Sequence, residues 1–221
     1  MKRLFIICGT IAFVFLSACS KKPVAGEEIV EKAKNKCEQL NSATITVTNT
    51  ETGKVEQTFS YLYDDDDNMV YLYKGIVDGK EVIEYNDSKS MYIKKDGNLT
   101  TVSSDNRDFE KFTIRKPHPN AGKGMILMSR DEVTDATVTL TENGKIVHHE
   151  YDTDKIEQID KSSGKLTKFI VEYYFDKNDD LLYFTEKTVF SKDGKETANV
   201  YKMEISEKNS IISIEKPAEL Q

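Results

Sequence analysis

The sequence is poor in the features that mark several large protein classes. Its 221 residues include 4 prolines and 11 glycines beside 11 tyrosines and 10 phenylalanines, so the composition does not indicate disorder. After residue 20, no apolar run approaches the about 20 residues that a membrane-spanning helix needs. The sequence contains no nucleophile elbow, His-Glu-x-x-His motif, phosphate-binding loop or paired-cysteine motif. We therefore expect one folded domain that is not an enzyme and holds no cofactor.

The N-terminus has the pattern of a secretory signal peptide. Lys2 and Arg3 precede an apolar run over residues 4–16, which is too short to span a bilayer. The run ends in Leu16-Ser17-Ala18-Cys19, which resembles the lipobox of bacterial lipoproteins. The resemblance implies cleavage before Cys19 and a diacylglyceryl group on its sulfur. The alternative is an ordinary signal with a chance cysteine.

These features predict where the protein is located. We expect residues 1–18 to be the signal peptide and residues 19–25 a lipidated tether. The expected location is the extracytoplasmic side of the cell membrane, where acyl chains hold the chain without spanning the bilayer. The full chain has 31 basic and 38 acidic residues, with a net charge of -7. An acidic exported protein is a poor candidate for nucleic-acid binding.

Cysteine is also scarce. Of three cysteines, Cys8 would leave with the signal peptide and Cys19 would carry lipid, so Cys37 has no partner for an intrachain disulfide. Cys37 falls on the apolar face of a helix predicted over residues 26–40, which indicates a buried thiol rather than a nucleophile. Glu27 and Glu28 suit the first turn of this helix.

After the helix, the chain changes to short alternating segments separated by turn residues. In residues 165–175, the apolar residues Phe169, Val171, Tyr173 and Phe175 share one face, which predicts a sheet with one buried face. Asp-Gly and Asn-Gly pairs between the segments predict hairpins and hence an antiparallel meander. The predicted strands cover residues 44–50, 55–63, 69–76, 81–85, 91–94, 134–141, 145–151, 165–175, 180–191, 196–204 and 211–215.

Residues 112–131 interrupt this rhythm, and we expect a loop or short helix across the sheet. Met125, Ile126, Leu127 and Met128 are a candidate ligand lid, because methionine adapts to irregular apolar partners. The alternative is an element that completes the core. This region is also basic, which suggests contact with anionic lipid headgroups or a solvated positive face. Its basic residues are Lys111, Arg115, Lys116, Lys123 and Arg130.

Two polar motifs are weak metal-site candidates. The run Tyr63–Asn68 contains four aspartates but lacks the spacing of a calcium loop, and a solvated turn is the simpler interpretation. His148 and His149 are neighbours in a predicted strand and so point to opposite faces, and His118 lies in a proline-rich segment. We expect no metal site and no catalytic residue.

The arrangement of lipobox, helix ending in "LNSATITVT", meander and closing strand pair "VYKMEISEKNSIISIEKP" resembles the LolA-like lipoprotein-carrier superfamily. That group includes the mycobacterial LppX and LprG types and poorly characterised Gram-positive lipoproteins. The resemblance implies an α+β fold over residues 26–221. It consists of a strongly curved, mainly antiparallel sheet, an open half-barrel, with the N-terminal helix and the mid-chain segment packed on its concave face.

In the characterised carriers of this group, the cavity holds acyl chains. The expected function is therefore non-enzymatic binding or carriage of a hydrophobic or amphipathic ligand, such as a lipid. The alternative is an envelope protein-interaction or structural module whose sheet is filled by its own side chains.

Overall fold

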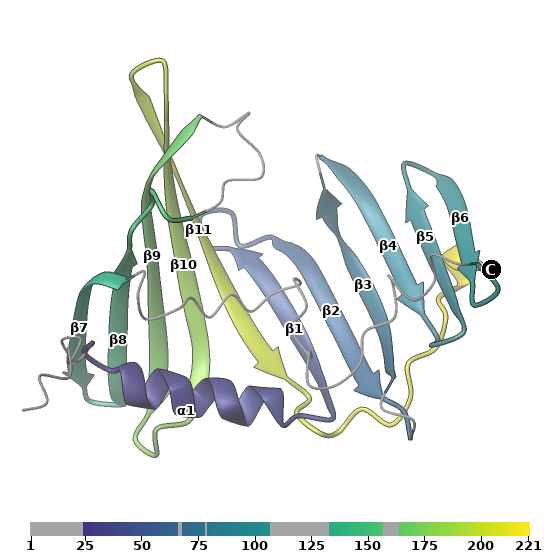
Figure 1. Ribbon diagram of the computed structural model, residues 1–221, viewed down its shortest axis with the longest axis horizontal. Coiled ribbons are helices and arrows are strands. Elements are labelled where there is room, and N and C mark those ends of the chain that lie inside the picture. The colour runs from purple at the N-terminus through teal and green to yellow at the C-terminus, as the bar shows by residue number, and fades with distance from the viewer. Residues whose placement is uncertain (1–23, 66–67, 78, 107–132, 157–163) are drawn as a thin grey trace, which may run out of the picture.

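The computed structural model describes residues 24–65, 68–77, 79–106, 133–156 and 164–221. They form one antiparallel sheet of 11 strands, and helix α1 (Glu27–Glu38) crosses it near one end of the strands (Figure 1). Besides α1, the helical structure in these ranges is the short 3-10 turn η3 (Ala218–Leu220), so the fold is mainly β rather than the expected α+β. The strands are β1 (Ser42–Asn49), β2 (Val55–Tyr63), β3 (Met69–Val77), β4 (Lys80–Asn86), β5 (Ser90–Lys95), β6 (Asn98–Ser103), β7 (Val133–Thr141), β8 (Gly144–Tyr151), β9 (Lys165–Asp176), β10 (Leu181–Lys192) and β11 (Lys195–Ser206).

Two meanders meet in the middle of the sheet. Strands β1 to β6 follow one another outward to one edge, and β7 to β11 return from the opposite edge, so that β11 pairs with β1. Thr44 lies opposite Ser206 in this central pair. The β5–β6 and β10–β11 hairpins turn at Asp96-Gly97 and Asp193-Gly194, whose residues all have positive φ. This is the tight turn expected from Asp-Gly pairs, because it matches the twist of the strands.

The C-terminal segment differs from the prediction. Residues 211–215 are not a strand, because β11 already pairs on both sides and offers no free edge. The segment instead runs past the ends of the strands toward β5 (Figure 1). There, the Tyr85 hydroxyl donates to the Ile214 carbonyl oxygen at 3.2 Å, and the Lys216 ammonium lies 4.2 Å from the centroid of the Tyr92 ring.

Leu220 anchors this tail, which leads to a stability prediction. Its side chain is 1% exposed, whereas Ile212 in the same tail is 93% exposed. We expect Leu220→Ala to lower the free energy of unfolding by about 2–3 kcal/mol, since a buried leucine loses its contacts and leaves a cavity. Ile212→Ala is the matched control and should change stability by less than about 0.5 kcal/mol. Urea denaturation measures both, and equal losses would show that the tail is not packed as described.

Candidate functional site

One face of the sheet, here called the apolar face, carries the buried side chains. In β9, Phe169, Val171, Tyr173 and Phe175 are all at most 5% exposed, and the residues between them are more exposed. This confirms the alternation predicted from the sequence. The opposite face, here called the polar face, carries the more exposed side chains between them, such as Thr44 and Thr46 of β1 and Glu172 of β9. The buried side chains of the apolar face form two hydrophobic clusters, one under α1 and one on β1 to β4.

Helix α1 covers the β8–β11 part of the apolar face (Figure 1). It buries Val30, Ala33 and Cys37 in one cluster with the apolar side chains of those strands. Cys37 is 7% exposed, which confirms the predicted buried position. Burial raises the pKa of its thiol, so the reactive thiolate is disfavoured. Cys37 is therefore a packing residue.

Gly26 fixes the chain where it joins α1. Its φ is 74°, and a Cβ atom there would lie 2.4 Å from Cγ1 of Val147. Gly53 has a similar φ of 68° but nothing within 4 Å of the added atom.

The two glycines form a matched pair for a stability test. We expect Gly53→Ala to cost about 1 kcal/mol from the left-handed backbone alone. Gly26→Ala should cost about 2 kcal/mol more than that, because Val147 and the helix must move apart. Thermal and urea unfolding of both variants measure the difference, and equal costs would contradict the close contact.

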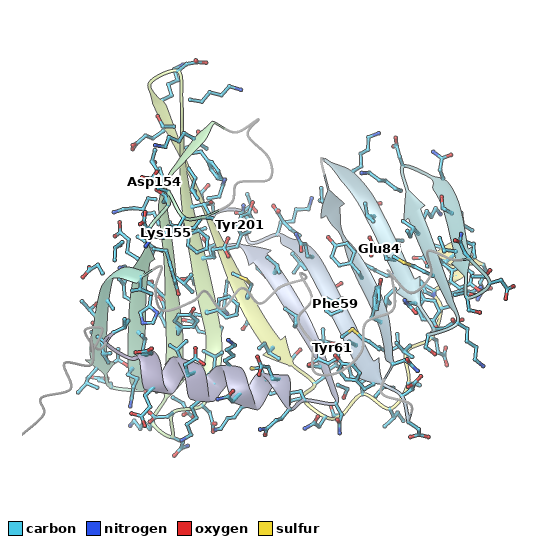
Figure 2. All side chains as sticks on the ribbon, in the orientation of Figure 1. Phe59, Tyr61, Glu84, Asp154, Lys155 and Tyr201 are labelled. Carbon is cyan, nitrogen blue, oxygen red and sulfur yellow. The ribbon has the colours of Figure 1, made fainter. Side chains whose placement is uncertain are left out.

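Beyond the end of α1, the apolar face carries a row of aromatic side chains on β2 and β3, here called the aromatic row. Phe59 and Tyr61 lie past the end of the helix (Figure 2). The rings contact one another, with centroid distances of 5.4 Å for Phe59–Tyr71 and 5.8 Å for both Phe59–Tyr61 and Tyr61–Tyr63. Burial raises the pKa of Tyr61 to about 12. The row thus combines apolar ring faces with phenolic hydroxyls that stay protonated at neutral pH.

Glu186 places a carboxyl group on the same apolar face. It lies two residues after Phe184 in β10, opposite Tyr201 of β11 and Val171 of β9. Removal from water raises its pKa to about 6. Among the described residues, no hydrogen bond or ion pair to Glu186 is present. The alternation of Phe184, Glu186 and Phe190 along β10 was the sequence pattern that could have identified it, and our sequence analysis missed it.

A hydrogen-bonded chain links α1 to the sheet through His149. Its Nε2 donates to the Ala25 carbonyl oxygen at 2.9 Å, which fixes the tautomer and leaves Nδ1 to accept from the Tyr151 hydroxyl at 3.5 Å. The Tyr173 hydroxyl lies 3.3 Å from that of Tyr151 and continues the chain. Burial lowers the pKa of His149, so the imidazole is neutral at pH 7. The arrangement positions the start of the helix and is structural.

The predicted metal-site candidates do not form a site. His148 lies on the polar face, with Nδ1 3.3 Å from a carboxylate oxygen of Glu172, and so points away from His149 as predicted. Asp64 caps the β2–β3 turn by accepting from the Asn68 backbone N–H at 2.8 Å. No group of three or more histidine, cysteine or acidic side chains suited to a metal ion occurs in the described ranges.

A hollow of about 340 Å³ lies on the sheet near β2, β3 and β4, and reaches the C-terminal tail. Lys74 and Glu219 pair across it at 3.7 Å. Its lining mixes both charge signs with a few aliphatic groups, which does not match the apolar surroundings that acyl chains require. The charged lining residues are Lys54, Glu56, Lys74, Glu81 and Glu219.

The remaining predicted site residues lie outside the described ranges. These are Cys19, the candidate lid Met125, Ile126, Leu127 and Met128, and the basic residues between 111 and 130. Their roles stay predictions. None of the helices within the described part of the chain has the length and hydrophobicity needed to cross a membrane.

The described elements define an antiparallel sheet protein with an N-terminal helix over part of one face. No protein-family model matches the sequence, and no curated protein matches it. The structure is similar to the crystal structure of LprF from Mycobacterium bovis, with 16% sequence identity, 86% of this chain and 96% of that chain covered, and a TM-score of 0.49. A structural similarity at this sequence identity says nothing about a ligand.

Proposed function

We propose that this protein is an exported lipoprotein, anchored through Cys19, whose apolar sheet face binds a hydrophobic or amphipathic ligand such as a lipid. Residues 1–18 would be the signal peptide and 19–25 the tether. Residues 26–221 would form one half-barrel-like domain of the LolA/LppX type, with Met125–Met128 as the lid. The protein performs no chemistry on its ligand in this proposal, and binding is by burial of apolar groups.

The observation that carries this proposal is the carboxyl group of Glu186 on the apolar face. Glu186 is half-buried, and partial removal of a carboxyl group from water is costly unless a hydrogen bond or ion pair compensates. A ligand with a hydroxyl or ammonium group beside an apolar tail would supply that partner. The tail would then extend toward the aromatic row, whose rings are at most 7% exposed and would have to part to admit it.

The contacts within the aromatic row favour a second candidate function. Phe59, Tyr61, Tyr63 and Tyr71 pack on one another, so the sheet fills this part of the face with its own side chains. A core filled in this way suits an envelope interaction or structural module that binds no small molecule.

Native mass spectrometry of residues 20–221 purified from bacteria, followed by organic extraction, separates the two functions. A stoichiometric lipid supports ligand binding and identifies the ligand class. In that case, Glu186→Gln should lower the lipid occupancy, whereas the exposed Glu196→Gln on β11 should leave it unchanged. A clean protein mass that gains nothing on incubation with lipids would reject ligand binding and favour the interaction module.

A further inference from the structure

We infer that the β7 edge of the sheet faces the membrane surface and that Leu140 inserts into the headgroup region of the bilayer. This inference rests on the proposed lipid anchor at Cys19. It adds that the domain has a defined orientation on the membrane. That orientation is set by where the tether joins the fold and by which surface the tether holds close to the bilayer.

The tether joins the domain at the β7–β8 edge. Val24 borders a small cavity of about 20 Å³ together with Val133 of β7 and His149 of β8. The Ala25 carbonyl accepts the hydrogen bond from His149, and Gly26 lies against Val147 and Val138. Figure 1 shows α1 beginning beside β7 and β8. The position of Val24 relative to this edge is therefore fixed by contacts on both strands.

The tether is short compared with the sheet. Val24 is five residue steps along the chain from Cys19, and a fully extended chain of this length spans at most about 18 Å. The opposite edge, β6, is ten strand positions from β7, which corresponds to about 48 Å at the usual strand spacing. An acyl chain on Cys19 thus holds the β7 edge near the bilayer, and it places no such constraint on β6.

The β7 edge presents the apolar side chains that this contact needs. Leu140 is 79% exposed and Val138 is 42% exposed, and the two share one side of the strand. The strand VTDATVTLT has Asp135 as its one charged residue, and it lacks the lysine and proline that usually protect an edge from association. The β6 strand likewise lacks lysine and proline, has no charged residue, and leaves Leu99 46% exposed. The reach of the tether is what distinguishes the two edges.

The chemistry of the edge defines the kind of contact. An edge strand has backbone groups without strand partners, which hydrocarbon cannot satisfy, so the strand must stay at the level of headgroups and water. Leucine at this level reaches about 5–10 Å into the boundary of headgroups and acyl chains. Asp135 and the exposed Glu142 of the β7–β8 turn would oppose an anionic surface. The contact is therefore apolar and should be insensitive to salt.

The absence of tryptophan from the chain makes a direct test possible. Leu140→Trp introduces a single fluorescent reporter at the proposed contact, and Leu99→Trp introduces the matched reporter on the opposite edge. Each full-length protein is expressed with its own signal sequence, its intact mass is measured, and it is reconstituted into phosphatidylcholine vesicles. The lipids carry bromine either near the headgroup or deep in the acyl chain. Circular dichroism verifies that both variants are folded.

We expect the Leu140→Trp emission to fall by about twofold or more with shallow bromines, and less with deep bromines. The Leu99→Trp emission should not change. Lipid on Cys19 without quenching of the Leu140→Trp variant would leave the anchor intact and overturn the inferred orientation. A mass without lipid would reject the anchor and the inference with it. Concentration-dependent dimers that shield the reporter without lipid would show that the edge pairs with a second copy, which would also overturn the inference.

Discussion

Replacing Phe184 by alanine is expected to lower the free energy of unfolding by about 3–5 kcal/mol. Phe184 is 1% exposed and lies in the cluster that joins α1 to the sheet. Its ring centroid is 5.9 Å from that of Tyr173, and Met203 lies opposite it on β11. Removal of the ring leaves a cavity between the helix and the sheet that neither rigid element can close. Urea denaturation followed by circular dichroism at pH 7.5 measures the loss.

Phe190 is the matched control for this experiment. It lies on the same strand and the same face, six residues further on, but is half-buried at the margin of the cluster. Phe190→Ala should cost about half as much as Phe184→Ala or less, because less area is removed from water in the native state. Equal losses would contradict the position of the core under α1.

Replacing Glu186 by glutamine is expected to raise the free energy of unfolding by about 1–2 kcal/mol at pH 7.5. The folded-state pKa of about 6 exceeds the ordinary glutamate value of 4.5, so the folded protein favours the protonated carboxyl. Ionisation therefore costs stability above pH 6, and the cost is relieved as the pH falls toward 4.5. The wild type should gain stability relative to Glu186→Gln over this interval. Urea unfolding at several values between pH 5 and pH 8 measures the difference.

A control variant isolates the Glu186 effect, and the contribution of His149 is common to all of the proteins compared. Glu196→Gln changes an exposed glutamate on the neighbouring strand and should follow the wild-type pH dependence. His149 acts in the opposite direction, because its lowered pKa means that its stabilising contribution is present above pH 6.5 and lost as the pH falls. Since His149 is present in the wild type and in both variants, its contribution to the pH dependence of stability cancels when they are compared. Parallel pH curves for the wild type and Glu186→Gln would show that the carboxyl is hydrated.

Local sequence patterns were sufficient to predict most of the strands. The ten strands expected between residues 44 and 204 match the structure within two residues at each end, because alternation and turn residues are local properties. The same periodicity correctly placed Cys37 in the core and the two adjacent histidines on opposite faces. Strand β6 was missed, since its sequence NLTTVS is exposed and has no apolar alternation.

Features that depend on distant contacts could not be predicted in this way. The sequence of residues 211–215 has the pattern of a strand, but whether this segment pairs depends on which strands of the sheet have a free edge beside it. The partial burial of Glu186 depends on having β9 and β11 as neighbours, and strand order is not visible in a single strand. The central pairing of β1 with β11 belongs to the same class of features.

That central pairing has a consequence for how the chain folds. Thr44 and Ser206 are hydrogen-bonded neighbours 162 residues apart in sequence, whereas every other strand pair in the described sheet joins consecutive strands. Contacts this distant carry a high loop-closure entropy and slow the folding of β proteins. Helix α1 is near the N-terminus and is synthesised early, but it buries its apolar side against strands near the C-terminus that are synthesised late. The N-terminal half therefore lacks its final partners until β11 is in place, and we expect slow folding as one cooperative unit rather than stepwise folding of the two meanders.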